Sequence, residues 1–194
     1  MKSPMRCPWV DLGKPLYVSY HDLEWGVPVH DDRKMFEMLV LESAQAGLSW
    51  YTVLSKRANY RRLFDGFDPQ RMATYDARKI EKLLGDAGII RNRLKIESAV
   101  NNAQRYLELV AERGSFADYL WGFVGGKVKL NQFRSLADYA ARSAESDALS
   151  KDLKRRGFRF VGSTIMYAHM QACGLVNDHA LGCFRREQLI ASGA

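Results

Sequence analysis

The segment from residue 41 to residue 51 constrains the fold most, because it places a carboxylate and an indole on either side of a glycine. The run before it begins with two aspartates suited to cap a helix, and its apolar residues follow the spacing of one helical face. Glu42 lies on that same face, seven residues beyond Met35. Since an unpaired carboxylate is costly to bury, Glu42 requires a partner or a ligand if this face is buried.

Gly47 interrupts the helical pattern and predicts the end of this helix. Ser49 can cap the next helix, which would leave Leu48 on an exposed corner and turn Trp50 back toward the protein. Taken alone, the segment is equally compatible with a glutamate exposed at a helix end and an ordinary core tryptophan.

The helical pattern continues along most of the chain. Start and stop signals predict helices over residues 17–25, 50–64, 76–84, 91–112, 146–157 and 162–174, with short ones after Asp68 and Ser115. Residues 123–140 are less regular, and we predict a loop there with a brief extended piece at 127–130. The 194 residues suffice for one well-cored domain or two small ones; because we find no repeats or linkers, we expect one domain over residues 1–194.

The composition is that of a soluble folded protein, with 47% apolar and 26% charged residues. No apolar run approaches the roughly 20 residues that cross a bilayer, and no apolar signal core follows the first residues. We therefore expect a cytoplasmic protein with no membrane contact. The net charge of +7 suggests a polyanionic partner, although many basic proteins carry such a charge without one.

Basic residues are concentrated in residues 149–164, where two predicted helices are joined by a short turn with a glycine at each end. The start of the second helix offers free N–H groups and a positive dipole end to a phosphate. This layout predicts a helix-hairpin-helix that grips the DNA backbone without reading its sequence. The alternative is a solvated basic helix end before an ordinary turn. The candidate DNA contacts in this segment are Lys154, Arg155, Arg156, Gly157, Gly162, Ser163 and Thr164.

The three cysteines cannot form a paired framework, so reduced thiols and metal ligation are both open. Cys7 with His21, and His179 with Cys183, could supply the two sulfurs and two nitrogens of a tetrahedral structural zinc site. His179 and Cys183 are four residues apart, which puts them on one side of a helical turn. Cys173 is typical of a buried, inert thiol.

Aromatic residues are dense near the start of the chain, at Trp9, Tyr17, Tyr20 and Trp25. The spacing within the predicted helix over residues 17–25 places Tyr17, Tyr20 and His21 on one side. They could form a binding surface or pack onto the core as an aromatic clasp.

With these features together, the chain resembles the constitutive type I (Tag) family of 3-methyladenine DNA glycosylases over nearly its full length. The resemblance rests on Cys7-Pro8-Trp9 and on residues 17–28 (YVSYHDLEWGVP), 36–54 (FEMLVLESAQAGLSWYTVL), 86–91 (DAGIIR), 146–164 and 171–183 (QACGLVNDHALGC). It implies an all-α helix-hairpin-helix DNA glycosylase fold, with the hairpin near residues 146–174. A zinc snap would join residues 7–21 to residues 179–183. The resemblance implies one structural zinc ion and no organic cofactor, with the ligands Cys7, His21, His179 and Cys183.

The same resemblance implies a pocket for a damaged base, with Glu42 as the catalytic residue. Its substrate-binding residues would be Trp9, Tyr17, Tyr20 and Trp50, and its DNA contacts would include Gly47 and Leu48. Methylation at N3 makes adenine cationic, so aromatic faces and a carboxylate favour it over the neutral base. The expected activity is excision of flipped-out 3-methyladenine from alkylated double-stranded DNA, releasing the free base. Leu48 would fill the emptied stack, and we expect a monomer.

One departure from related helix-hairpin-helix enzymes limits the mechanism. Many of them place a catalytic aspartate after the hairpin; Asp178 follows Gly162 by sixteen residues but directly precedes His179. We therefore interpret Asp178 as a residue that supports the metal site or caps a helix. The hairpin turn contains no lysine, so we predict a monofunctional enzyme that leaves an abasic site without cleaving the strand.

Three other functions compete with this one. A glycosylase of the same fold could act on a different range of alkylated purines. A non-catalytic module, stapled by zinc, could recognise damaged or bent DNA and recruit other proteins. A metal-dependent hydrolase is disfavoured, because a closed set of two cysteines and two histidines leaves no open coordination position.

Overall fold

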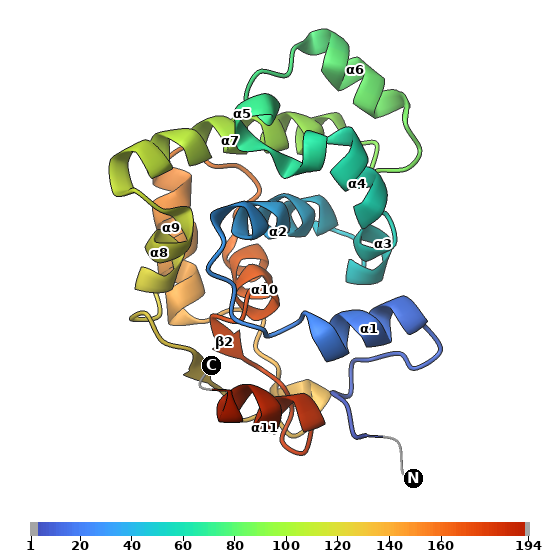
Figure 1. Cartoon of the computed structure of the whole chain (residues 1–194), viewed down its shortest axis with the longest axis vertical. Helices are drawn as coiled ribbons and strands as arrows, with labels where there is room; N and C mark the ends of the chain where they lie inside the picture. The colour runs from blue at the N-terminus through green and yellow to red at the C-terminus, as the bar shows by residue number, and fades with distance from the viewer. Residues whose placement is uncertain (1–3, 193–194) are drawn as a thin grey trace.

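Helix α2 (Asp32–Gln45) runs through the middle of the protein in the computed structural model, which describes residues 4–192 (Figure 1). Residues 35–44 of this helix are all buried, and α2 contacts α3, α7, α8 and α10. A helix that is buried on every side belongs in the centre of a fold. The Asp31 side chain accepts a hydrogen bond from the Lys34 backbone N–H, which confirms the predicted helix start.

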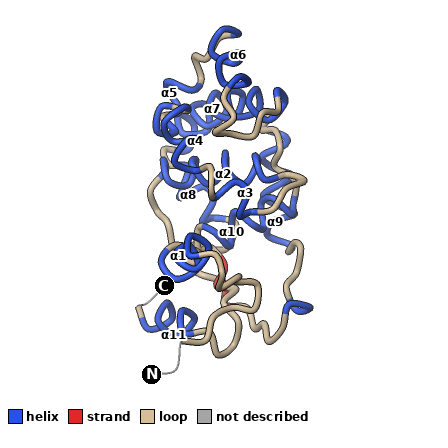
Figure 2. The backbone as a smooth tube through the Cα atoms, turned by 90° about the vertical axis from the view of Figure 1, so that its right-hand side faces the viewer, coloured by secondary structure: helices blue, strands red, loops and turns tan. Residues whose placement is uncertain are grey.

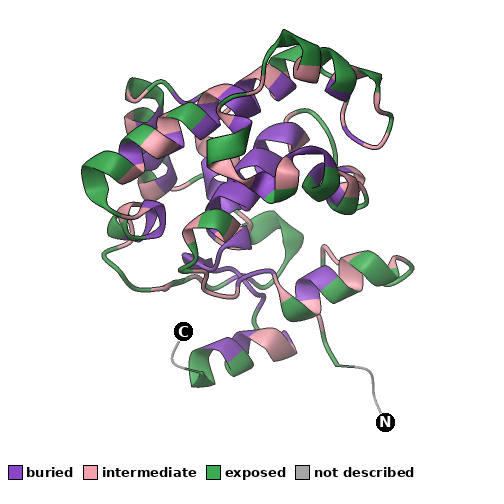
Figure 3. Cartoon of the chain, turned by 45° about the horizontal axis from the view of Figure 1, so that its top comes forward, coloured by how far each residue is buried: buried purple, intermediate pink, exposed green. Residues whose placement is uncertain are grey.

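The remaining elements surround this central helix. They are α1 (Pro15–Leu23), α3 (Trp50–Leu54), α4 (Arg57–Leu63), η1 (Asp65–Phe67), α5 (Pro69–Met72), α6 (Ala77–Gly85), α7 (Arg93–Arg113), α8 (Phe116–Gly122), η2 (Leu136–Asp138), α9 (Ala144–Arg155), α10 (Ser163–Ala172) and α11 (Phe184–Ala191). Helices α4 to α7 form one end of the molecule, and α1 and α11 lie at the opposite end (Figures 1 and 2). Buried residues gather on the central helices, while the outer faces are exposed (Figure 3).

A short parallel ladder joins two distant segments. Strand β1 (Lys129–Leu130) pairs with β2 (Val176–Asn177). The brief extended piece predicted near residue 130 is therefore confirmed, but the sequence did not reveal its partner. The pairing ties the long loop after α8 to the segment that follows α10.

The helix predicted over residues 50–64 is divided into α3 and α4. The Ser55 hydroxyl donates to the Thr52 carbonyl, and the Lys56 N–H bonds to the Val53 carbonyl instead of to that of Thr52. A side chain that competes for a backbone carbonyl weakens the helix at that point. The prediction of one continuous helix was wrong for this reason.

Two predicted helix starts also move by two residues. Helix α1 begins at Pro15, because proline is favoured at the first helical position. Helix α9 begins after Ser143, which forms a capping box with Ser146. Within residues 4–192, no helix combines the length and the apolarity that crossing a bilayer requires.

Candidate functional site

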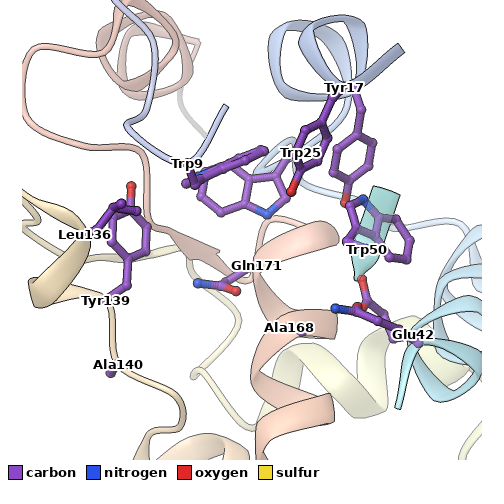
Figure 4. Close-up of a pocket in the computed structure, with 12 residues that line it drawn as sticks. Trp9, Tyr17, Trp25, Glu42, Trp50, Leu136, Tyr139, Ala140, Ala168 and Gln171 are labelled. Atoms are coloured by element: carbon purple, nitrogen blue, oxygen red, sulfur yellow. The ribbon is translucent and has the colours of Figure 1, made fainter. Parts of the chain in front are cut away.

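A cavity of about 300 Å³ opens between α1, α2 and α10, and we call it the aromatic cavity (Figure 4). All five residues predicted for the base pocket line it: Trp9, Tyr17, Tyr20, Glu42 and Trp50. The structure adds others that the sequence analysis did not assign to it, namely Trp25, Gln45, Leu136, Tyr139, Ala140, Ala168 and Gln171. The lining residues from Leu136 onward are more than 80 residues away from α2 in the sequence. No local sequence pattern predicts that these segments approach α2.

Aromatic rings form the walls of this cavity. Tyr20 from α1 lies 5.3 Å from Trp50, measured between ring centroids, and Tyr17 lies 5.1 Å from Trp9. Trp9 in turn lies 4.8 Å from Trp25. Because the rings come from three separate parts of the chain, the cavity offers several aromatic faces to a planar ligand, and a cationic ligand gains most from them.

Glu42 projects from α2 into the aromatic cavity beside Trp50 (Figure 4). Its residue is only 4% exposed, and no hydrogen-bond or ion-pair partner from residues 4–192 reaches its carboxylate. Burial without a partner raises the pKa of Glu42 to about 8, because desolvation penalises the charged form. The alternative of a glutamate exposed at a helix end is therefore wrong, and Glu42 has the unpaired carboxylate that a ligand would satisfy.

Three buried hydrogen-bond donors in the lining also lack partners in the described part of the chain, one of them the Tyr139 hydroxyl. The indole N–H groups of Trp9 and Trp50 are buried and have no acceptor in the described part of the chain. A buried donor without an acceptor costs free energy that a ligand with an acceptor can recover. The aromatic cavity therefore combines an unpaired carboxylate with unpaired donors, which is typical of a binding site.

The corner at residues 46–49, which we call the wedge loop, lies beside this cavity. Gly47 has a φ of +77°, and Leu48 is 41% exposed, as predicted. The Ser49 hydroxyl accepts from the Thr52 N–H and caps α3, which confirms the predicted helix start. A second hollow of about 290 Å³ lies between this loop and the start of α10, and it shares Glu42 with the aromatic cavity.

Lys95 anchors the wedge loop, and sequence reasoning missed it. Its ammonium group donates to the carbonyls of Ala44 at 2.8 Å and of Ala46 at 2.6 Å. These carbonyls lie at the end of α2, where unpaired acceptors and the negative dipole end attract a cation. Nothing in the sequence near Lys95 indicates this contact, since about fifty residues separate the partners.

The predicted hairpin turn between α9 and α10 is held from two sides. The Asn102 amide accepts from the Arg159 N–H and donates to the Arg159 carbonyl, at 2.8 and 2.9 Å. The Ser43 hydroxyl donates to the carbonyl of Phe160, a residue with a φ of +52°. Ser43 is next to Glu42 on α2. Helix α2 therefore holds the hairpin turn through Ser43 and lines the aromatic cavity through Glu42.

The basic residues of the hairpin differ in their availability. Lys154 and Arg155 are exposed, although Arg155 also pairs with Asp152. The Arg156 guanidinium bonds to Asp152 and Glu112 and lies over the Tyr119 ring. The prediction that Arg156 contacts DNA is not supported by this arrangement, because its charge is already engaged in holding α9 against α7 and α8.

The start of α10 remains open to an anion. A Cβ placed on Gly162 would meet no atom within 4 Å, and Thr164 is exposed. The Ser163 hydroxyl, however, donates to Asp147 and also bonds to Ser146. The backbone N–H groups rather than this hydroxyl are therefore the part of the predicted DNA contact that is free.

The four predicted metal ligands come together in one buried cluster. The ligand atoms of Cys7, His21, His179 and Cys183 all lie within 4.8 Å of one another, and they could hold a metal ion. His21 Nδ1 lies 2.7 Å from an oxygen of Asp22, and His179 Nε2 lies 3.0 Å from the Trp25 carbonyl. Because these oxygens only accept, each ring presents the lone pair of its other nitrogen to the cluster, where the Cys7 N–H also lies 3.4 Å from His21 Nε2.

Those lone pairs face the sulfurs, so the donor set fits a metal. His21 Nε2 lies 3.5 Å from Cys183 Sγ, and His179 Nδ1 lies 3.4 Å from Cys7 Sγ. Histidines that bind metals usually donate their second ring N–H to a carbonyl or carboxylate in this way. Four protein donors leave no open position, which is typical of a structural site.

Asp178 does not serve this cluster. It is buried, and its carboxylate accepts from Asn131, Tyr167 and Gln171 at 2.7, 2.8 and 2.7 Å. None of these is a candidate metal ligand or the first turn of a helix. The interpretation of Asp178 as a support for the metal site or a cap is therefore wrong. Cys173, in contrast, is fully buried as predicted, and burial raises the pKa of its thiol.

Known proteins share this architecture. A family model described as methyladenine glycosylase matches residues 9–186. The chain is 52% identical to DNA-3-methyladenine glycosylase 1 of Escherichia coli strain K12 over 178 residues, which cover 92% of this chain and 95% of that protein. It is similar to a crystal structure of 3-methyladenine DNA glycosylase I, with a TM-score of 0.90, 53% identity and coverage of 93% and 98% of the two chains.

A second solved structure adds a ligand to the comparison. It is a variant of 3-methyladenine DNA glycosylase I in complex with 3-methyladenine, with a TM-score of 0.90, 36% identity and coverage of 93% of this chain and 97% of that one. The structural likeness at this identity confirms the predicted all-α fold class.

Proposed function

The chain belongs to the methyladenine glycosylase family, and from that membership we propose that it is a DNA repair enzyme that excises 3-methyladenine from alkylated double-stranded DNA. One observation carries the proposal: a buried, unpartnered carboxylate faces a cavity walled by aromatic rings. This combination suits a planar cation, and methylation at N3 gives adenine its positive charge.

Selectivity for the damaged base follows from the cost of ionising Glu42. Because burial raises the pKa of Glu42 to about 8, much of the free enzyme holds this group neutral near pH 7. A cationic base that enters the cavity offsets the desolvation of the carboxylate and favours its ionisation. Neutral adenine offers no such compensation, so it binds less well.

The bond that breaks joins C1′ of the sugar to N9 of the base. Its electron pair leaves with the methylated base, which becomes neutral, while water supplies the hydroxyl group at C1′ and releases its other proton to the solvent. A leaving group that departs neutral needs little help from an acid, so the enzyme works chiefly by extruding the base and binding it. We assign Glu42 to stabilise the positive charge while the bond breaks, and the four aromatic residues Trp9, Tyr17, Tyr20 and Trp50 to hold the ring.

We further propose a monofunctional enzyme. A glycosylase that also cleaves the strand uses an amine that attacks the sugar, and no lysine lines the aromatic cavity among residues 4–192. The hairpin turn also has no lysine. The product is therefore an abasic site in an intact strand, together with the free base.

The DNA is gripped by the hairpin and opened by the wedge loop in this proposal. Gly47 and Gly162 both leave open space where a side chain would stand, so a DNA backbone can approach closely there. Leu48 is exposed at the corner and can fill the stack that the flipped base leaves. Lys154 and Arg155 supply charge near the hairpin.

We propose that the buried cluster of cysteines and histidines binds one zinc ion, held by Cys7, His21, His179 and Cys183. The bound ion would cross-link the beginning and the end of the chain and would take no part in base release. The single domain, the monomeric state and the cytoplasmic location remain predictions.

Release of free base from DNA treated with dimethyl sulfate tests the function. We expect 3-methyladenine in the chromatogram with the wild-type protein and a strongly reduced amount with Glu42→Gln, which cannot ionise. Glu81→Gln is the matched control, because Glu81 is an exposed residue on α6 that lines none of these hollows. Binding of DNA without any released base would instead support the non-catalytic recruitment module, and release of other alkylated purines would support the broader glycosylase.

A further inference from the structure

Gln171 lines the aromatic cavity together with Glu42, but the excision described above gives it no role. We propose that Gln171 determines specificity: its carbonyl oxygen accepts a hydrogen bond from the 6-amino group of the flipped base and disfavours bases with a 6-oxo group. This inference rests on the proposed function, because it names the chemical edge by which the same cavity recognises its substrate.

Asp178 sets the orientation of the Gln171 amide. Gln171 Nε2 lies 2.7 Å from Asp178 Oδ2. The Asp178 carboxylate accepts from Gln171, Asn131 and Tyr167, so the Gln171 amide nitrogen faces Asp178 and the amide oxygen faces the other way. In Figure 4 the nitrogen of Gln171 points away from Glu42, and the oxygen lies on the side that faces Glu42.

The position of this oxygen is also fixed. Asp178 is only 1% exposed, and its carboxylate accepts two further hydrogen bonds, from Asn131 and Tyr167. The Gln171 backbone carbonyl accepts from the Gly26 N–H at 3.0 Å. A group held at both its backbone and its side chain loses little conformational entropy when a ligand binds.

Gln45 provides a contrast within the same cavity. Its amide has no hydrogen-bond partner in the described part of the chain, so it can rotate and offer either its oxygen or its nitrogen. A group that adapts in this way accepts both kinds of base edge. Gln171 cannot adapt, and this difference is why we assign the discrimination to Gln171.

The chemistry of the base completes the inference. Adenine carries an amino group at position 6 with two hydrogens to donate, whereas guanine carries an oxygen there that only accepts. The carbonyl of Gln171 only accepts and can take one of the two amino hydrogens, and the carboxylate of Glu42 can take the other when it is ionised. A 6-oxo group would leave a buried acceptor unpaired against another acceptor, which weakens binding.

Two free bases test this inference; their heavy atoms differ only at position 6, and the oxo form also carries a proton on its imidazole ring. We would measure the binding of 3-methyladenine and of 3-methylhypoxanthine, its 6-oxo counterpart, by quenching of tryptophan fluorescence, since Trp9 and Trp50 line the cavity. The wild-type protein should prefer 3-methyladenine. Gln171→Met keeps the length of the side chain but removes its acceptor, and it should reduce this preference about fivefold, as expected for one neutral hydrogen bond.

Gln104→Met is the matched control. It makes the same chemical change at an exposed position on α7, where the amide donates to the Ala73 carbonyl. The control should keep the wild-type preference. Metal content and thermal unfolding would establish that each variant is folded.

Two results would overturn the inference: equal binding of the two bases by the wild-type protein, or an unchanged preference in folded Gln171→Met. If Gln171→Met does not fold, the comparison of the two bases on the wild-type protein decides. The proposed function fails separately, because it requires that the wild-type protein release 3-methyladenine from alkylated DNA. Release of the base together with an unchanged preference in Gln171→Met would remove only the role of Gln171.

Discussion

Replacing Glu42 with glutamine should stabilise the protein, and the gain should grow with pH. In the folded protein the pKa of Glu42 is raised from 4.5 to about 8 by burial. The unfolded chain loses this proton above pH 4.5, whereas the folded chain retains it until about pH 8. Stability is therefore lost as the pH rises between these two values, because folding must then either keep the proton or bury the charge. Glutamine removes this loss.

The size of the effect follows from the two pKa values. At about 1.4 kcal/mol for each pH unit between them, the ionised carboxylate costs about 5 kcal/mol of unfolding free energy above pH 8. The same relation gives about 3 kcal/mol at pH 7 and less than about 1 kcal/mol at pH 5. For a chain of this length, about 3 kcal/mol raises the melting temperature by roughly 6 °C or more.

Thermal and urea unfolding of the wild-type protein and Glu42→Gln, measured from pH 5 to pH 9, would test this expectation. The difference between the two proteins isolates Glu42, since all other titrating groups are common to both. Glu81→Gln, at an exposed position, should show no such trend. A difference that stays constant across this pH range, or a variant that is less stable at pH 8, would refute the assignment of Glu42 as a buried, unpartnered carboxylate.

Three further expectations follow from the site. The kcat/KM for release of 3-methyladenine should rise with pH up to about pH 8, because only ionised Glu42 in the free enzyme balances the cationic base; a flat profile in this range would contradict that role. Removal of the metal with a chelator should lower both the melting temperature and the affinity for the free base, because Trp25 lines the cavity and its ring lies 4.7 Å from that of His179. Unchanged base affinity in the metal-free protein would show that the two sites are independent. Arg156→Met should lower the melting temperature with little change in the salt dependence of DNA binding, because Arg156 bonds to Glu112 within the protein. Arg155→Met should weaken DNA binding and reduce its salt slope by about 1, because Arg155 is exposed. The reverse pattern would exchange the roles of the two arginines.

The hairpin illustrates where local sequence reasoning stops. The basic residues within residues 149–164 predicted a DNA-binding hairpin, and the prediction did not distinguish Arg155 from Arg156. In the structure Arg156 bonds to Glu112, which is 44 residues away, while Arg155 stays exposed. A long charged side chain takes its partner from whatever element packs beside it, and the sequence around it does not identify that element.

The sequence by itself determined the features that depend on neighbours three or four residues apart. The capping residues Asp31 and Ser49, the glycine corner at Gly47 and the buried face of α2 all follow from helical spacing and the needs of unpaired backbone groups. The candidate metal ligands Cys7, His21, His179 and Cys183 were named because two sulfurs and two imidazoles suit a tetrahedral site, and because the chain resembles a family with that ligand set.

Only the tertiary structure decided which distant groups meet. In the structure the predicted helix over residues 50–64 is two helices, and Lys95 bonds to the end of α2 beside the wedge loop. Asp178 accepts from the Gln171 amide nitrogen and so orients the amide oxygen away from itself. Hydrogen bonds are short-ranged and directional, so their partners depend on how the helices pack rather than on the order of the residues. The residues that bind a ligand can therefore be suspected from the sequence, whereas the way each one is held and oriented is a property of the folded chain.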